Sequence, residues 1–266
     1  MNLFAVTLLS ASMGTDPLGE EIRQNFSGGA VSETLFRRVG PGPMRFMKTH
    51  PTGLRVTLPG DVAVPPVGVA SRLAVHGDFE ITATYQILKL GKPSGGHGAG
   101  VRLWIGMASP AAAAATLGRI VRPQDGDVYL TDHGFKAPDG KRAHQELDLS
   151  TSAKAGKLRL TRSGSTLVYL AADGLGSEFQ ELRREKFGSA PLHGVRIAAD
   201  TGGAPVEVDV LLVDFEIRAR ELSASPPSER QAGGPVWGVG LAISAALALG
   251  AFLYWRRRRG KPFPTT

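Results

Sequence analysis

Apolar residues recur at every second position in several short stretches of the chain, and a period of two predicts β-strands. The clearest run covers residues 78–87 (DFEITATYQI), in which the odd positions are apolar and most even positions are polar. Residues 101–107 (VRLWIGM) repeat the pattern, with Arg102 and Trp104 on the polar face. Each run therefore predicts a strand that has one face in a core and the other in water.

Two further segments carry recognisable strand signals. Residues 157–161 and 166–171 flank the turn residues 163–165 (SGS), and this arrangement predicts a β-hairpin. Residues 206–219 (VEVDVLLVDFEIRA) are apolar on both faces, which indicates a central or bulged strand.

Residues 127–131 (DVYLT) form another short alternating run, in which we expect Val128 and Leu130 to point inward and Tyr129 outward. In all, about ten short strands separated by turn signals are expected, without a convincing amphipathic helix. This pattern predicts an all-β fold, a two-sheet antiparallel jelly-roll sandwich that occupies residues 19–222.

The segment 236–255 (VWGVGLAISAALALGAFLYW) contains no charged residue and is followed by four arginines. It is long enough to cross a bilayer core of about 30 Å as one α-helix. We therefore expect a C-terminal transmembrane helix, preceded by a Pro/Ser/Gly linker at 223–235 and followed by a basic cytoplasmic tail at 256–266. The alternative is a buried core helix, but such a helix seldom runs so far without a polar face.

The first residues, 1–14, are apolar and then small, as in a secretory signal peptide. No lysine or arginine precedes the apolar run, so a first buried strand remains the alternative. With an export signal, the arginine-flanked helix would place the N-terminal domain outside the cytoplasm of a single-pass membrane protein.

The amino-acid composition excludes some classes of binding partner. The net charge is +7, but five of the positive charges lie in the tail, and the rest of the chain carries only +2. The basicity thus reflects membrane topology, and no basic stripe for nucleic acid remains. The chain has no cysteine, which excludes disulfides and thiolate metal sites and fits a bacterial cell-envelope protein.

Six motifs stand out along the chain: GDFEITATY at 77–85, GAGVRL at 98–103, KLRLTRSGS at 157–165, VDVLLVDFEI at 208–217, GLRVTLP at 53–59 and PPVGVA at 65–70. They resemble motifs of concanavalin A-like lectin/glucanase (LamG-type) jelly-roll domains, and in particular of an uncharacterised domain family of planctomycete bacteria. The resemblance implies the same fold over roughly residues 20–220. It implies little about activity, because this fold hosts lectins, glycosidases and adhesion modules.

Two aromatic side chains provide the candidate ligand site. Trp104 and Tyr129 are expected on the polar faces of their strands, where a sugar could stack on their rings. From the same surface, Arg102, Gln86 and Glu80 could hydrogen-bond to its hydroxyl groups. The alternative is that each ring packs against its own sheet or under a loop.

Catalytic and metal sites are not predicted. Glu207-Val-Asp209 is similar to the start of the Glu-x-Asp-x-Glu signature of laminarinase-type enzymes, but the third acid is missing and the position in the chain differs. The acids at 125, 127 and 132 match no calcium-loop spacing, and the histidines at 97 and 133 are expected in solvated loops. We therefore expect no catalytic residues, no cofactor and no enzyme activity.

Taken together, the sequence predicts a membrane-anchored extracytoplasmic jelly-roll module that binds carbohydrate or another ligand without catalysis. A structural or protein-interaction module of the cell envelope is the alternative, and a glycan-active hydrolase is a more distant one.

Overall fold

A computed structural model describes residues 18–107, 113–137, 139–176 and 178–224. The described residues form fifteen β-strands and two single 3₁₀ turns, η1 (Ser27–Gly29) and η2 (Pro43–Arg45). The strands are β1 (Glu20–Asn25), β2 (Phe36–Val39), β3 (Met47–His50), β4 (Gly53–Leu58), β5 (Val67–Ser71), β6 (Leu73–Leu90), β7 (Ala99–Met107), β8 (Ala114–Arg122), β9 (Gly126–Lys136), β10 (Arg142–Ser150), β11 (Ala155–Ser163), β12 (Thr166–Asp173), β13 (Gln180–Lys186), β14 (Leu192–Asp200) and β15 (Val208–Ala224).

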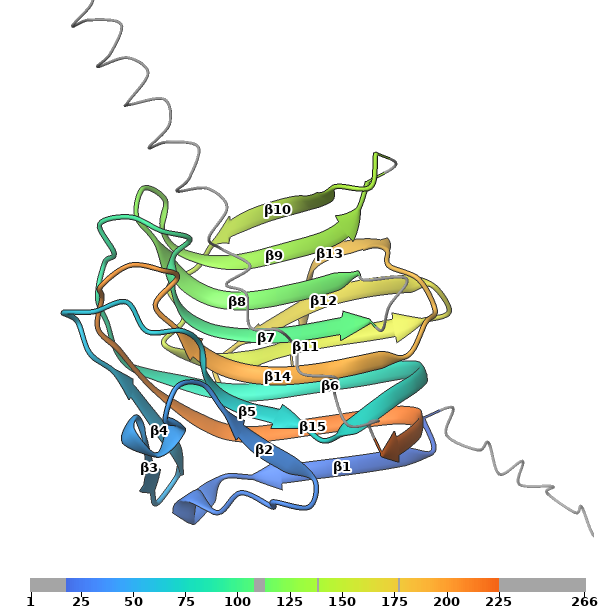
Figure 1. Cartoon of the computed structure of the whole chain (residues 1–266), viewed down its shortest axis with the longest axis horizontal. Helices are drawn as coiled ribbons and strands as arrows, with labels where there is room; N and C mark the ends of the chain where they lie inside the picture. Colours follow the sequence, from blue (N-terminus) through green and yellow to red (C-terminus); the bar gives the residue numbers. More distant parts are fainter. Residues whose placement is uncertain (1–17, 108–112, 138, 177, 225–266) are drawn as a thin grey trace, which may run out of the picture. The chain divides into compact units, whose positions relative to one another are not determined.

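Antiparallel pairing arranges these strands in two layers. Sheet I has the order β10-β9-β8-β7-β14-β5-β2. Sheet II has the order β13-β12-β11-β6-β15, and β15 continues to β1 along one part of its length and to β4-β3 along another. One pair, Leu192 with Val75, joins the two layers at an edge. Figure 1 shows β10, β9, β8, β7 and β14 following one another through sheet I.

The core lies between the inner faces of the two sheets. Leu103 and Ile105 of β7 belong to the same buried cluster as Ile81 of β6 and Phe215 of β15. Burial of apolar surface on both inner faces is the main force that stabilises a sandwich of this kind. The all-β antiparallel jelly roll that the alternating pattern predicts is therefore confirmed.

Individual strand predictions are also confirmed. β11 and β12 form the expected hairpin, in which Gly164 has a φ of 58° between the paired residues Ser163 and Thr166. β15 is a central strand of sheet II and its register against β6 shifts at three places, as expected for a bulged strand. The fold nevertheless contains more strands than sequence periodicity indicates. β8, β10 and β13 are three strands that the pattern does not predict.

The predicted orientation of β9 is wrong. Tyr129 is only 5% exposed and belongs to the main core, where its hydroxyl donates a hydrogen bond to Asp173 at 2.5 Å. Val128 and Leu130 form a separate small apolar cluster with Ile120 of β8. The alternating pattern could not identify the core face of β9, because both faces of this strand bury apolar groups. In addition, the tyrosine hydroxyl has a polar partner inside the protein.

β15 extends to Ala224, two residues beyond the predicted domain end. The expected signal segment 1–14, the membrane helix 236–255, the tail 256–266 and residues 225–235 of the linker lie outside the described residues. Within the described part of the chain, no helix combines the length and the apolar character that a membrane crossing requires.

Candidate functional site

The five predicted ligand residues do not share one surface. Trp104 and Arg102 lie on the outer face of sheet I, which points away from the core. Gln86 and Glu80 lie on the outer face of sheet II, because they alternate with the core residues of β6. Tyr129 lies in the core between the sheets. The prediction of a single surface is therefore corrected, and only Trp104 and Arg102 remain together.

Cross-strand pairing instead places Trp104 in a transverse row of side chains on sheet I. In this row Arg196 of β14 opposes Trp104, and Trp104 opposes Thr116 of β8. Thr116 then opposes Asp132 of β9, which opposes Glu146 of β10. Directly opposed residues on one face have Cβ atoms about 4.5–5.5 Å apart, so these five side chains form a continuous line. We call this line the sheet I row.

The indole of Trp104 lies against two glycines. A Cβ atom on Gly106 would come within 2.4 Å of Cη2 of the indole, and a Cβ atom on Gly194 would come within 2.7 Å of its Cζ3. Gly106 and Gly194 are themselves paired across β7 and β14. The missing side chains thus let the six-membered part of the indole rest on the sheet, and Trp104 remains partly exposed.

A guanidinium accompanies this ring. The Cζ atom of Arg196 lies 4.7 Å from the Trp104 ring centroid, within the range of a cation–π contact. Burial lowers the pKa of Arg196, Asp200 raises it, and Arg37 and Arg102 add to the lowering. Arg37 belongs to the same face, because it opposes Ala70 of β5, which opposes Arg196.

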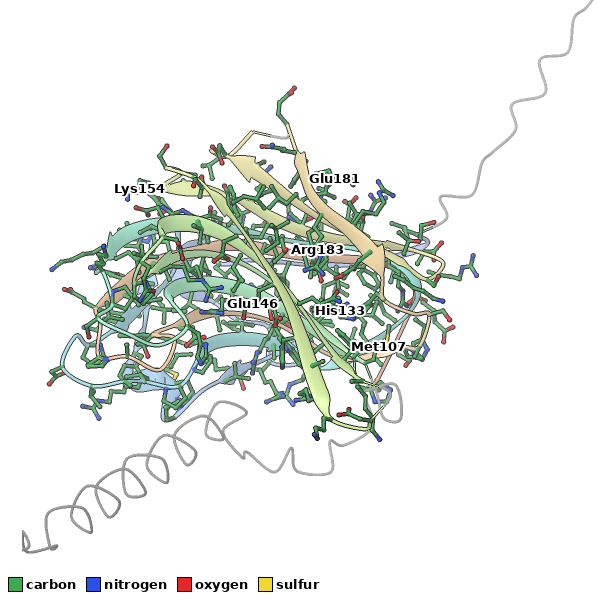
Figure 2. The ribbon with its side chains drawn as sticks, turned by 90° about the horizontal axis from the view of Figure 1, so that it is seen from above. Met107, His133, Glu146, Lys154, Glu181 and Arg183 are labelled. Carbon is green, nitrogen blue, oxygen red and sulfur yellow. The ribbon has the colours of Figure 1, made fainter. Side chains whose placement is uncertain are left out.

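The other end of the row is acidic. Asp132 is 8% exposed, and burial raises the pKa of its carboxyl group. Nδ1 of His144 lies 3.1 Å from Oδ1 of Asp132, and this contact partly offsets the rise in the pKa. Glu146 is more exposed and pairs with Arg122 at 2.6 Å. A second acid of β10, Asp148, shares the same arginine at 2.8 Å. Figure 2 labels Glu146 on β10.

The side chain of Arg102 is already bonded to neighbouring residues and is not free to bind a ligand. Its guanidinium lies 3.1 Å from Asp200 and donates hydrogen bonds to the carbonyl oxygens of His97 and Gly98. Only 8% of the residue is exposed. Arg102 therefore fixes the glycine-rich connection before β7, and its ligand role remains only a prediction.

The acids of the Glu207-Val-Asp209 segment are ion-paired on sheet II. Glu207 lies 2.7 Å from Nζ of Lys89, and Asp209 pairs with Arg55 at 2.5 Å and also accepts a hydrogen bond from Thr57. These contacts give both acids a structural role at the position where β4, β15 and β6 meet.

A second polar cluster lies between the two sheets. His133 is part of β9, in contrast to the expected loop position, and is 8% exposed. Its Nδ1 lies 3.1 Å from Glu185, which also accepts hydrogen bonds from Tyr169 and Arg183 at 2.5 Å each. Burial opposes ionisation of Glu185, but hydrogen bonds from His133 and Tyr169 lower its pKa. Figure 2 shows His133 and Arg183 in the same region of the sandwich.

Sequence reasoning missed most of the sheet I row. Thr116, Asp132, Glu146 and Arg196 come from four strands, and β8 and β10 are strands that the periodicity does not predict. The signal that could have revealed the row is the combination of an outward tryptophan with glycines two residues away on the same face, as in Trp104 and Gly106.

Comparisons with known proteins agree with this architecture. A model of the family described as "Protein of unknown function (DUF1583) C domain" matches residues 4–233. A search of curated protein sequences found no match. Among solved structures, an endo-acting O-glycanase of the human gut microbiota is 10% identical with a TM-score of 0.56, covering 74% of this chain and 98% of the other.

Two further structures are similar in the same way. The Crh5 transglycosylase in complex with NAG is 8% identical with a TM-score of 0.53, covering 77% of this chain and 86% of the other. LamAcat from Zobellia galactanivorans is 10% identical with a TM-score of 0.50, covering 76% and 95%. At such low identity these likenesses show the concanavalin-like jelly-roll fold, and function has to be argued from the site.

Proposed function

We propose that this chain, which belongs to the DUF1583 C-domain family, binds carbohydrate on the outer face of sheet I. The observation that carries the proposal is the indole of Trp104, which rests on Gly106 and Gly194 and is partly exposed. A core tryptophan would instead be enclosed on all sides, and an incidental surface ring would not need two paired glycines beneath it.

A flat aromatic ring on a sheet suits the apolar face of a sugar. The C–H groups of a pyranose ring can pack on the indole, while hydroxyl groups at the sugar's edge need hydrogen-bonding partners. Thr116, Asp132, His144 and Glu146 supply such groups along the same line. The names of the similar solved structures, which describe an O-glycanase and a transglycosylase in complex with NAG, also favour a glycan ligand.

The test is a glycan array probed with the full-length chain and with Trp104→Ala. We expect the substitution to weaken binding at least about tenfold, as for an aromatic group at the centre of a binding surface. Phe179→Ala is the matched control, because Phe179 also packs against an arginine, Arg159 at 4.0 Å, but contacts sheet II. Equal losses in both variants, or unchanged binding in Trp104→Ala, would refute the stacking site.

The acidic end of the row favours a second candidate function, the hydrolysis of a glycosidic bond. Asp132 and Glu146 are directly opposed across β9 and β10, and burial raises the pKa of Asp132 while Glu146 is more exposed. A glycosidase requires two carboxyl groups in different environments, and the rise in the pKa of Asp132 is in the direction that a general acid needs. In this role Asp132 would protonate the leaving oxygen, and Glu146 would act as base or nucleophile.

Two isosteric substitutions separate catalysis from binding. If the row hydrolyses glycans, Asp132→Asn and Glu146→Gln should each abolish sugar release from a bound polysaccharide while its affinity stays within about threefold. If the intact chain releases no reducing ends from any glycan that it binds, the site is a binding module alone. That second result would agree with the absence of a complete catalytic signature in the sequence.

We further propose that the predicted membrane helix at 236–255 displays this face outside the cytoplasm. The support is the uncharged apolar run with its four following arginines. Protease treatment of intact spheroplasts should remove the N-terminal domain and leave a short membrane-bound fragment. Protection of the domain in intact spheroplasts would refute this orientation. The protein-interaction alternative has its own test. If the unaltered chain and the Trp104→Ala variant both capture an envelope protein, that result would favour this alternative.

A further inference from the structure

Two arginines on the outer face of sheet I lack acidic partners among the described residues. The side chains of Arg196 and Arg37 form no hydrogen bond or ion pair with another described residue. By contrast, Arg102 on the same face is paired with Asp200, and Arg122 is paired with Glu146 and Asp148. The arginine end of the sheet I row therefore carries uncompensated positive charge.

The position of Arg196 makes this charge costly. The residue is mostly buried, and the charges that face it are the cations Arg37 and Arg102 and the anion Asp200. Asp200 already lies 3.1 Å from Arg102, and it attracts Arg196 without accepting a hydrogen bond from it. A buried guanidinium without a carboxylate or carbonyl partner is destabilising, so this residue gains from an anion that arrives with a ligand.

Arg37 lies near the same place, since its charge is close enough to lower the pKa of Arg196. It lies two strands from Arg196, a separation of roughly 10 Å between backbones, and only Ala70 stands between them on this face. Because the alanine is small, both guanidinium groups can reach the space above it. Arg37 is exposed, and it approaches this space from the side away from Trp104.

We infer that the glycan bound on the sheet I row is anionic, with a carboxylate or sulfate group that Arg196 and Arg37 hold beside a sugar stacked on Trp104. This inference rests on the proposed carbohydrate-binding function and specifies its ligand class. Planar guanidinium groups donate paired hydrogen bonds that match both carboxylate and sulfate oxygens, and the cation–π contact keeps Arg196 next to the stacked ring.

The experiment compares matched polymers that differ only in charge. Affinities of the full-length chain are measured for dextran sulfate against dextran, and for polygalacturonate against its fully methyl-esterified form, at about 0.15 M salt to screen diffuse attraction. The first pair tests sulfate and the second tests carboxylate. The variants are Arg196→Gln, Arg37→Gln and the control Lys48→Gln, which removes an exposed charge from β3 in sheet II.

We expect at least one anionic polymer to bind at least about tenfold more tightly than its neutral form. Arg196→Gln should remove most of this preference, and Arg37→Gln should reduce it about two- to fivefold, as for an exposed ion pair. Lys48→Gln should leave it unchanged. Arg37→Gln also protects the test from misfolding, because Arg37 is exposed and is not the residue that packs on Trp104.

Other outcomes overturn the inference in distinguishable ways. If charged and neutral polymers bind equally and Trp104→Ala weakens both, the glycan face stands but its anionic preference is wrong. If Lys48→Gln loses as much affinity as Arg196→Gln, the preference is a general charge effect. If no polymer in either pair binds and no glycan on an array does, the proposed function itself fails.

Discussion

Substitution of Gly106 by alanine is the most direct probe of the Trp104 platform. The added Cβ would lie 2.4 Å from Cη2 and 2.7 Å from Cζ2 of the indole, whereas ordinary contacts begin at 3.4 Å. β7 is hydrogen-bonded to β14 on one side and to β8 on the other, so its backbone has little freedom to move away. The indole must therefore rise from the sheet by about 1 Å.

This displacement gives a bounded prediction for affinity. A sugar held by the polar groups of the row cannot follow the raised ring freely, and a mismatch of 0.5–1 Å in a dispersion contact forfeits about a quarter to a half of its energy. If the stacked sugar contributes about 2 kcal/mol, as a central aromatic contact does, the expected loss is about 0.5–1 kcal/mol. The dissociation constant should then rise roughly two- to fivefold, which is less than the effect of Trp104→Ala.

The assay follows the ring and the ligand together. Trp237→Phe and Trp255→Phe leave Trp104 as the one tryptophan, so its emission reports the move into water, and calorimetry on the same protein gives the affinity. Gly176→Ala is the control, because a Cβ at this glycine would meet nothing within 4 Å. If Gly106→Ala kept both the parental emission and the parental affinity, the indole would not rest on this glycine and the platform would be refuted.

Three further substitutions test the fold around the site. Tyr129→Phe removes the hydrogen bond to Asp173, so the free energy of unfolding measured in urea should fall by about 1 kcal/mol while glycan affinity stays unchanged. If the variant instead lost affinity without losing stability, Tyr129 would belong to the binding surface. Glu185→Gln should cost about 1–3 kcal/mol at pH 7, because the buried donors of His133 and Tyr169 and the partly buried Arg183 lose a charged acceptor. Since the pKa of Glu185 is lowered from 4.5, its stabilisation is present above that value and is lost as pH falls, so the variant should lose less stability than the parent between about pH 5 and pH 3. Gly68→Ala places a Cβ 2.0 Å from the carbonyl oxygen of Ile197, so β5 must separate from β14 and the free energy of unfolding should fall by about 2 kcal/mol or more. An unchanged urea midpoint would contradict this close contact between the two strands.

Sequence periodicity predicts strands where one face is dry and the other wet. β6 meets this condition over part of its length, and β7 keeps the alternating sequence although Trp104 is its only residue that is not buried; the inward residues of both strands agree with the prediction. β10 and β13 fail it because they lie at sheet edges and bury few side chains, so their polar sequences resemble loops. β8 fails it for a different reason: Arg119 is fully buried and the next residue, Ile120, belongs to a separate apolar cluster, so apolar and polar residues do not alternate along the strand.

The site could be predicted only in part because it depends on register between distant strands. Trp104 was identified from its outward position alone. Its neighbours Arg196 and Thr116 come from β14 and β8, which are adjacent to β7 in space but not both adjacent in sequence. Gln86 and Glu80 were assigned to the same surface because polar alternation tells which side of a strand is wet, but does not tell which sheet the strand belongs to.

The outer face of sheet II pairs several of its charges, whereas the outer face of sheet I places a guanidinium without an acidic partner in the described chain beside a partly exposed aromatic ring. On sheet II, Glu80 lies 3.1 Å from Arg159, Arg23 lies 2.9 Å from Asp214, and the acids at 207 and 209 are paired as well. These paired groups gain little from a charged ligand, because each new contact must replace one that exists. On sheet I, Arg196 has no acidic partner among the described residues and Trp104 is partly exposed. An electrostatic and an apolar interaction are therefore left unfilled side by side, so a ligand that supplies an anion and a flat apolar face gains free energy from both at once.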